Sequence, residues 1–151
     1  MATTTDLVEV ATAAGASVTE IPRKEGWLLL QAWREVYCAP VREATGMWVR
    51  GGLAWHTFSH NYFPSVRGRR AFDQYRAQVS SDLLVLPEND HYVAIRCTSS
   101  YPVDFSGLGD VYVAPNSFEW TMAFTHEDPT YGPYFARADW RHRSGGLPDD
   151  I

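Results

Sequence analysis

The sequence predicts a single α+β domain with a mainly antiparallel sheet of four to six strands and two or three helices packed on one face of that sheet. The order of the segments predicts this class, because helical periodicity dominates the first half of the chain and short apolar runs separated by turn residues dominate the second. The length of 151 residues matches one domain, and 45% hydrophobic with 14% aromatic residues can form its core. We expect the domain to span residues 1–140 and residues 141–151 to form a flexible tail.

Three segments carry the apolar period of an amphipathic helix. The first covers residues 6–14, where Asp6 is placed to cap the start and Gly15 to end it. The second covers residues 24–39, and its apolar face consists of Trp27, Leu30, Trp33 and Tyr37. The third covers residues 66–79, and its mainly outward-facing basic residues are Arg67, Arg69, Arg70 and Arg76. A solvated helix face is a simpler interpretation of these arginines than a phosphate site.

The strands are expected in shorter runs, most of them in the second half of the chain. Alternating and continuous apolar runs predict strands over residues 17–21, 53–59, 82–86, 91–98, 110–114 and 118–126. The connection Pro-Glu-Asn-Asp at residues 87–90 is typical of a hairpin. After the last strand, residues 131–140 are expected to continue as an irregular aromatic segment.

The charge and the N-terminal residues disfavour several classes of protein. A net charge of −5 and an isoelectric point near 5.4 disfavour nucleic-acid binding, which requires clustered positive charge. No basic segment followed by an apolar run opens the chain, so we expect no signal peptide, and no apolar run approaches the roughly 20 residues of a membrane span. We therefore expect a cytoplasmic protein in which Cys38 and Cys97 are buried free thiols.

Two histidine-bearing segments form the candidate site. Residues 55–60, Trp-His-Thr-Phe-Ser-His, and residues 124–128, Phe-Thr-His-Glu-Asp, each place a histidine at or near the end of a predicted strand. Imidazole titrates near neutral pH and binds metal ions, so His56 and His126 in one cleft would suit acid–base chemistry or metal ligation. Glu127 adds a carboxylate, although neighbouring residues of a strand point to opposite faces of the sheet.

Three interpretations of these histidines stay open at the level of the sequence. They can be structural residues hydrogen-bonded at strand ends, a proton-transfer pair, or ligands of a metal ion. The spacing of His56 and His60 aligns two ligands only on a helix, and this segment is expected to be extended, so we expect no resident metal. No Gly-x-Ser-x-Gly, phosphate-binding loop, His-Glu-x-x-His or dinucleotide motif is present, so no cofactor is expected either.

A series of short motifs runs along most of the chain in a specific order: Glu20-Ile-Pro22, Trp33, Trp55-His56 with Phe58-Ser59, Asp110-Val-Tyr-Val113, Phe118-x-Trp120-Thr121, Thr125-His126-Glu127 and Gly132-Pro-Tyr-Phe135. In this order and spacing, from about residue 18 to residue 135, the sequence resembles a bacterial family known only as domain of unknown function 4275. The family pattern has an aromatic residue where this chain has His60, so the resemblance favours His56, His126 and Glu127 as site residues. It implies no established activity.

Two hypotheses of function follow, and they come from different classes. The first is a protein-binding module, immunity-like or regulatory, indicated by small size, acidic charge and many aromatic residues without a catalytic motif. It requires an exposed aromatic or acidic patch and histidines occupied by internal hydrogen bonds. The second is a small hydrolase- or nuclease-like enzyme in which His56 and His126 are an acid–base pair and Glu127 orients one of them. It requires a shared cavity, with ring nitrogens no more than about 12 Å apart.

Overall fold

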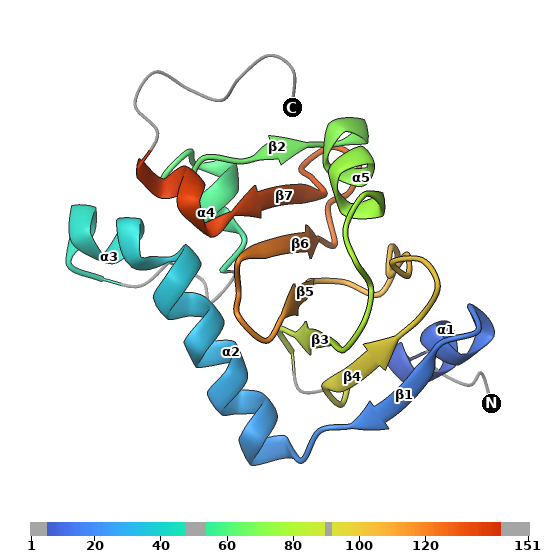
Figure 1. Cartoon of the computed structure of the whole chain (residues 1–151). Helices are drawn as coiled ribbons and strands as arrows, with labels where there is room; N and C mark the ends of the chain where they lie inside the picture. Colours follow the sequence, from blue (N-terminus) through green and yellow to red (C-terminus); the bar gives the residue numbers. More distant parts are fainter. Residues whose placement is uncertain (1–5, 48–53, 90–91, 143–151) are drawn as a thin grey trace.

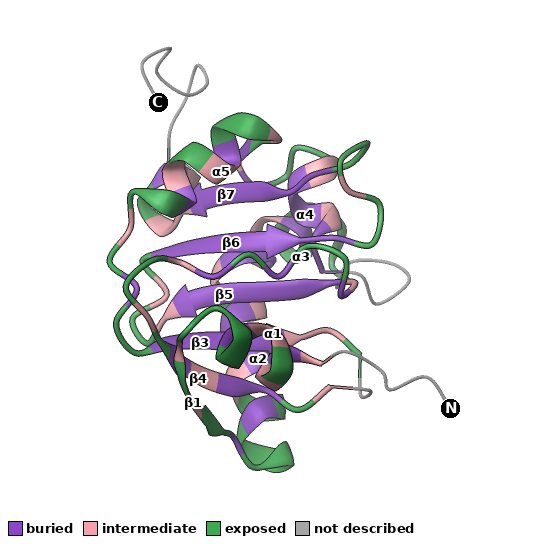
Figure 2. Cartoon of the chain, turned by 90° about the vertical axis from the view of Figure 1, so that its right-hand side faces the viewer, coloured by how far each residue is buried: buried purple, intermediate pink, exposed green. Residues whose placement is uncertain are grey.

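The computed structural model describes residues 6–47, 54–89 and 92–142, and these residues form a seven-stranded sheet between helices (Figure 1). The strands are β1 (Ser17–Glu20), β2 (Val66–Arg67), β3 (Leu83–Pro87), β4 (Ile95–Thr98), β5 (Val111–Pro115), β6 (Trp120–Phe124) and β7 (Tyr134–Arg137). Their order across the sheet is β1-β4-β3-β5-β6-β7-β2, and each neighbouring pair is antiparallel. Figure 2 shows that β5, β6 and β7 are buried along almost their whole length.

Helices cover both faces of the sheet. They are α1 (Leu7–Ala13), α2 (Arg23–Tyr37), α3 (Ala39–Thr45), α4 (His56–Ser59) and α5 (Arg69–Arg76), followed by a 3-10 turn at Ala138–His142. The α2 residue Trp33 stacks on Tyr112 of β5, with ring centroids 4.1 Å apart, and Tyr112 is paired with Ala123 of β6. The α5 residue Tyr75 contacts Phe124, which follows Ala123 in β6 and so points to the opposite face. The expectation that the helices pack on one face is therefore wrong.

The prediction of a single α+β domain with an antiparallel sheet is confirmed, but the expected counts of strands and helices are too low for the described residues. One additional strand, β2, lies at the start of the helix predicted over residues 66–79. Gly68 separates β2 from α5 and has a φ of 64°. A residue with a side chain adopts this left-handed conformation only at an energetic cost. The other additional strand, β7, lies in the segment expected to be irregular and pairs with both β6 and β2.

The strand predicted over residues 53–59 is also wrong, and residue 53 lies outside the described part of the chain. A turn at Ala54 and Trp55 leads directly into the helix α4. The N–H groups of Thr57 and Phe58 donate to the carbonyls of Ala54 and Trp55 at 3.1 and 2.9 Å. Trp55 and Phe58 are both buried, because residues three apart share one face of a helix. In a segment this short, the pattern of apolar residues fits the period of a helix as well as that of a strand.

The remaining predicted elements are confirmed, with ends that differ by a few residues. In α1, Asp6 is the N-cap and accepts the Glu9 N–H at 2.8 Å. In α2, three residues of the predicted apolar face are buried, whereas Trp27 is 60% exposed. The strands predicted over 17–21, 82–86, 91–98, 110–114 and 118–126 are β1, β3, β4, β5 and β6. Residues 143–151 of the expected tail and His91 of the predicted fourth strand lie outside the described residues.

Two further expectations concern the cysteines and the membrane. Cys38 and Cys97 are buried free thiols, as predicted. Burial raises the pKa of the Cys38 thiol to about 12, so this thiol is not a reactive thiolate at neutral pH. Of the helices in the described part of the chain, none has the length and apolar character needed to cross a membrane.

Candidate functional site

The predicted site residues gather at one edge of the sheet, where β3 and β6 end and β5 and β7 begin. The strand register places Val111 of β5 beside both Pro87 of β3 and Phe124 of β6. Figure 2 shows α4 beside this same edge, near the end of β6. We call the following group the edge cluster: Trp55, His56, Asp110, His126 and Glu127.

His126 is held by Asp110 through both its ring and its backbone. The imidazole Nδ1 lies 2.9 and 3.1 Å from the two carboxylate oxygens of Asp110. The backbone N–H of His126 donates to Asp110 Oδ1 at 3.0 Å. The Asp110 side chain is 11% exposed and that of His126 is 48% exposed, so the carboxylate is shielded while the imidazole is accessible. A carboxylate bound at Nδ1 sets the orientation of the ring and directs its chemistry to Nε2.

The pKa of His126 is raised above its ordinary value. The main cause is the hydrogen bond to the Asp110 carboxylate, which favours the imidazolium form. Partial burial opposes this effect, and the negative charges of Asp110, Glu127 and Asp128 add to it. At neutral pH, a larger share of His126 is therefore protonated than in free histidine.

Asp110 owes its position to the pairing of β3 with β5. Its carbonyl accepts the N–H of Glu88 at 2.9 Å. This bond extends the ladder by one residue beyond the last paired residues, Pro87 and Val111. The carboxylate of Asp110 therefore projects from a backbone that the sheet itself holds in place.

A buried polar network connects this part of the sheet to the turn before α4. The Glu88 carboxylate accepts from Arg34 Nη2 at 2.6 Å, from the Tyr112 hydroxyl at 2.8 Å and from the Ala54 N–H at 2.6 Å. The Tyr112 hydroxyl in turn accepts the N–H of Trp55 at 3.0 Å. The network therefore holds in place the backbone that carries the rings of Trp55 and His56.

His56 is the first residue of α4 and has a different kind of partner from His126. Its Nδ1 lies 2.9 Å from Ser59 Oγ, one turn along the helix. Its pKa is lowered, first by burial and second by the charge of His60. The negative charge of Glu127 opposes this shift. At neutral pH, His56 is therefore an uncharged imidazole.

Trp55 lies in contact with both imidazoles of the edge cluster. Its ring centroid is 4.1 Å from that of His56 and 6.0 Å from that of His126, and the sum of the two distances limits how far apart the imidazoles can be. The positive charge of His126 lowers the pKa of His56, as this proximity requires. The indole Nε1 is buried and finds no hydrogen-bond acceptor among the described residues. The structure therefore brings the two predicted histidines together against one indole.

The two histidines nevertheless do not line one common hollow. His126 lines a hollow of about 340 Å³ together with Thr125 and Asp128, and His56 is not among the residues that line it. Ser59, the partner of His56, lines a separate hollow of about 510 Å³. Neither of these hollows is the shared cavity that an acid–base pair of His56 and His126 requires.

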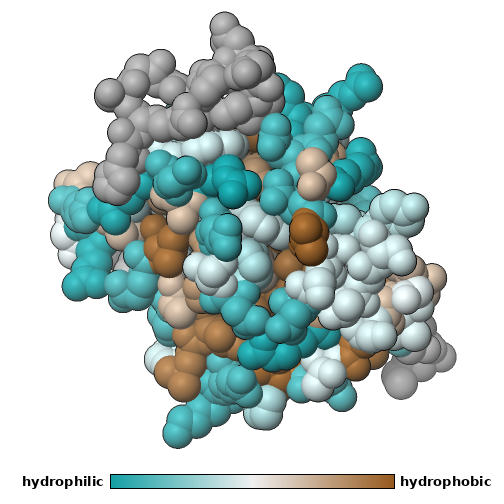
Figure 3. Space-filling model, viewed as in Figure 1, coloured by the Kyte–Doolittle hydropathy of each residue, from teal (hydrophilic) through white to brown (hydrophobic). Residues whose placement is uncertain are grey.

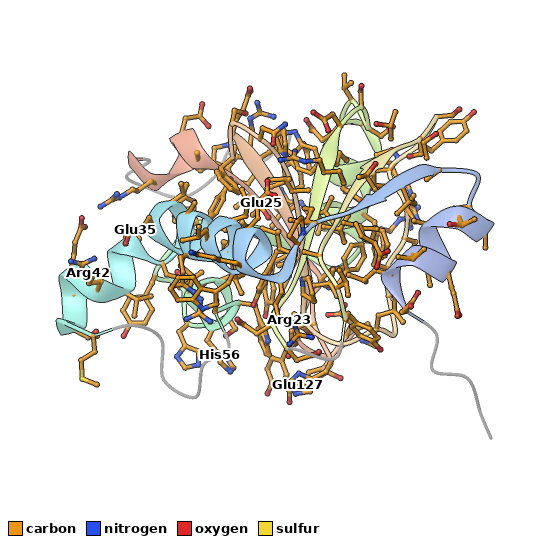
Figure 4. The ribbon with its side chains drawn as sticks, turned by 90° about the horizontal axis from the view of Figure 1, so that it is seen from below. Arg23, Glu25, Glu35, Arg42, His56 and Glu127 are labelled. Carbon is orange, nitrogen blue, oxygen red and sulfur yellow. The ribbon has the colours of Figure 1, made fainter. Side chains whose placement is uncertain are left out.

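Glu127 lies in the turn after β6, because that strand ends at Phe124. The alternation of faces along a strand therefore does not apply to Glu127 and its neighbour. Its side chain is exposed, and Figure 4 shows it on the same side of the molecule as His56. Its charge raises the pKa of both histidines, but the carboxylate that orients His126 is Asp110.

Sequence reasoning did not select Asp110 and gave no weight to Ser59. An acidic residue before a strand is an ordinary turn residue, and only the pairing of β5 with β6 brings positions 110 and 126 together. Ser59 was adjacent to histidines in sequence, which carries little information alone. The turn of helix at α4 is what places its hydroxyl on the His56 imidazole.

The spacing of His56 and His60 falls on a helix after all, since His60 is the C-cap of α4 and the ring centroids are 5.0 Å apart. Two imidazoles alone are fewer protein ligands than a zinc site uses. Within the described residues, no group of three or more His, Cys, Asp or Glu side chains is arranged to hold a metal ion.

The fold and the edge cluster define an antiparallel α+β protein with a carboxylate–imidazole pair at one end of its sheet. Over residues 6–135 the chain matches the family described as Domain of unknown function (DUF4275), and it belongs to that family. The match covers most of the chain and confirms the resemblance drawn from the motifs. No match was found among curated proteins or among solved structures.

Proposed function

We propose that the chain is a protein-binding module that docks a segment of its partner around Trp27. The observation that carries this proposal is a hollow of about 390 Å³ with exposed apolar walls. Trp27 is 60% exposed and Val93 is 41% exposed, and both line the hollow. Tryptophan is enriched among the residues that dominate binding energies at interfaces. We call the following lining residues the Trp27 surface: Arg23, Trp27, Leu30, Tyr92 and Val93.

The close approach of α2 to the chain before β4 explains the shape of this surface. Gly26 is buried, and a Cβ atom at that position would lie 3.1 Å from the Cβ of Ala94. Because Gly26 has no side chain, the neighbouring Trp27 and Val93 can border one hollow. Figure 3 shows hydrophobic side chains at the surface over α2, in the lower left of the view.

The charge around the Trp27 surface indicates what kind of segment would bind there. Arg23 is the first residue of α2, is exposed, and forms no ion pair with any described residue. The N-cap Pro22 offers no side-chain acceptor, so the positive end of the helix dipole also lies here. A partner segment with an apolar or aromatic anchor and a nearby carboxylate would complement both features. Figure 4 shows the position of Arg23.

The test compares two variants that each remove one exposed aromatic side chain. Tagged wild-type chain, Trp27→Ala and Tyr101→Ala are used to capture proteins from an extract of the native host, and the dissociation constant is then measured with the purified partner. We expect Trp27→Ala to bind at least about tenfold more weakly, as the loss of a central aromatic anchor does. Tyr101, which is 80% exposed and lies outside the Trp27 surface, should be replaceable without effect. A partner held equally by wild type and Trp27→Ala would contradict the proposal.

A second candidate function, acid–base catalysis at His126, is favoured by the contact between Asp110 and His126. An accessible imidazole whose Nδ1 is bound by a shielded carboxylate has the arrangement of a general base. A panel of ester and phosphodiester substrates should then show hydrolysis that is lost in His126→Gln and retained in His60→Gln. Hydrolysis that persists in His126→Gln would exclude this role.

A further inference from the structure

We propose that His56 and His60 together bind one divalent transition-metal ion, and that copper(II) binds there most tightly. His56 is the first residue of α4 and His60 is its C-cap, and their ring centroids lie 5.0 Å apart. The expectation of no metal at this spacing assumed an extended segment, and the helix α4 removes that assumption. This site goes beyond the proposed protein-binding function, because neither histidine lines the hollow of the Trp27 surface.

The distance between the two imidazoles matches chelation of one ion. A metal ion bound at about 2.0 Å by one nitrogen of each ring, with about 90–110° between the two bonds, requires ring centroids about 4.5–5 Å apart. The observed separation of 5.0 Å agrees with this requirement. The N–H of His60 donates to the His56 carbonyl at 3.0 Å, so a helical turn fixes the spacing of the two residues. The rings need to rotate to bind the ion, but the backbone does not need to move.

The ring of His56 is already held in one orientation. Its Nδ1 lies 2.9 Å from Ser59 Oγ, and the indole of Trp55 packs against it with ring centroids 4.1 Å apart. Because Nδ1 is occupied, Nε2 is the nitrogen left for a metal ion, and it forms no hydrogen bond with any described residue. An imidazole whose second nitrogen is hydrogen-bonded is the usual form of a histidine ligand.

The ring of His60 can turn toward the ion at little cost. Its side chain is exposed, and its ring nitrogens have no hydrogen-bond or ion-pair partner within the described part of the chain. Its ring contact is with His56 itself. Reorienting this imidazole therefore breaks no polar interaction.

The surrounding charge favours a cation at this position. Burial has the largest effect on the pKa of His56 and lowers it, whereas the negative charges of Glu127 and Asp110 raise it. The field of both carboxylates therefore reaches the imidazole, and it would stabilise a bound dication. The positive charge of His126 opposes them, but its effect on His56 is smaller than that of either carboxylate.

The ligand set indicates which ion binds. Among the described residues, no third His, Cys, Asp or Glu side chain joins the pair, so solvent oxygens would complete the coordination. Nitrogen and oxygen ligands in a tetragonal arrangement are typical of copper(II) and nickel(II), and copper(II) binds most tightly in the divalent series. Magnesium prefers a shell of oxygen ligands and should not compete.

Binding is measured by isothermal titration of copper(II), nickel(II) and magnesium(II) into the full chain at pH 7.5, with glycine as a weak competing ligand that keeps copper in solution. We expect one copper(II) ion per chain, nickel(II) at least about tenfold weaker, and no saturable binding of magnesium(II). His60→Gln should weaken binding of copper(II) at least about tenfold, because it removes one of the two ligands. Ser59→Ala should weaken it less, about fivefold, because the His56 ring loses the partner that orients it.

The matched control is His126→Gln, which removes an accessible imidazole from the edge cluster but not from the pair. This variant should bind copper(II) at least as tightly as the wild type, since it removes a positive charge near His56.

A second measurement does not depend on the folding of any variant. Pulsed electron paramagnetic resonance of the copper(II) complex of the wild-type chain counts the imidazoles bound to the metal, and we expect two. Absence of saturable copper(II) binding, a single bound imidazole, unchanged affinity in His60→Gln, or equal weakening in His60→Gln and His126→Gln would each overturn the assignment. Trp27→Ala should bind copper(II) as the wild type does, which separates this result from the fate of the protein-binding proposal.

Discussion

His126 and His56 lie at the same sheet edge and contact the same indole, yet their surroundings act on them in opposite ways. His126 is accessible, and its partner is a shielded carboxylate that raises its pKa. His56 is more buried, and its partner is a hydroxyl that brings no charge to oppose the desolvation that lowers its pKa. The comparison teaches that a place in the edge cluster does not by itself determine the protonation state of an imidazole. The partner at Nδ1 and the degree of burial define it.

The difference also assigns complementary states to the two rings. Between their two pKa values, His126 is an imidazolium and His56 is a neutral imidazole. Environments that push two titratable groups apart in this way are typical of sites where one group donates and the other accepts a proton. At this edge, however, the hollow that His126 lines does not include His56, so the two imidazoles do not share that space.

The largest expected effect comes from Gly132→Ala, which breaks the turn that carries His126. Gly132 has a φ of +107°, and a Cβ there would lie 2.6 Å from Asp128 Oδ1 and 3.2 Å from Thr125 Cγ2. Because strain and overlap combine, we expect the free energy of unfolding to fall by about 3 kcal/mol. Chemical denaturation monitored by tryptophan fluorescence gives this value.

The matched control is Gly107→Ala. Gly107 has a φ of +87°, but a Cβ there meets nothing within 4 Å. The left-handed conformation alone should cost about 1–2 kcal/mol. Equal losses of the free energy of unfolding in the two variants would mean that the close contacts around Gly132 add nothing to the cost of the left-handed conformation, and so contribute nothing to holding the turn that carries His126.

A smaller effect is expected from Asp110→Asn, which removes the main cause of the raised His126 pKa. The amide keeps an acceptor oxygen for the His126 N–H but loses the charge, so the pKa of His126 should fall toward or below its ordinary value of about 6.5. Histidine side-chain NMR across pH 4–9 measures it. Glu127→Gln should lower this pKa less, since Glu127 contributes only through its charge.

The same variant changes how stability depends on pH. The folded His126 has a raised pKa, so its stabilising contribution is complete below about pH 6.5 and is lost as pH rises through the folded pKa. This contribution is at most about 1 kcal/mol, because the pair is partly exposed. In Asp110→Asn that decline with rising pH should disappear. A decline that persists unchanged would show that another group causes it.

The smallest expected effect comes from His60→Asn, which acts on His56 alone. The charge of His60 lowers the pKa of His56, so its removal should raise that pKa, while burial still holds it below the ordinary value. His60 is not among the groups that act on His126, so the pKa of His126 should not move. Equal movement of both histidines in the NMR titration would contradict the separation of the two rings.

The parts of the fold that depend on local periodicity could be predicted, and those that depend on pairing could not. The burial of Leu30, Trp33 and Tyr37 on one face of α2 and the cap at Asp6 are local features and were predicted correctly. Trp27 was assigned to the same buried face, but helical period does not reveal where the sheet beneath a helix stops. Periodicity also cannot show which face of the sheet a helix covers, because the pattern reveals only that the helix is apolar on one side.

The candidate site shows the same division. His126 could be selected as a candidate because it follows a strong strand signal, whereas its partner Asp110 depends on the register between β5 and β6. His56 could also be selected as a candidate, but its helical setting was missed because four residues are too few to distinguish the period of a helix from that of a strand. The arginines of residues 66–79 were interpreted as a solvated helix face, and only the break at Gly68 reveals that Arg67 belongs to a strand and Arg70 to a helix.

The strand order has a consequence for how the chain is made. Both outermost strands and α2 are translated early, whereas the five central strands come from residues 83–137. Trp33 finds its hydrogen-bond partner Thr121 only 88 residues later, at 2.9 Å. On the ribosome, the apolar side of α2 must therefore wait uncovered until β5 and β6 have been synthesised. Throughout that interval α2 exposes apolar surface that favours self-association, and this surface is covered only after residues 111–124 have been synthesised.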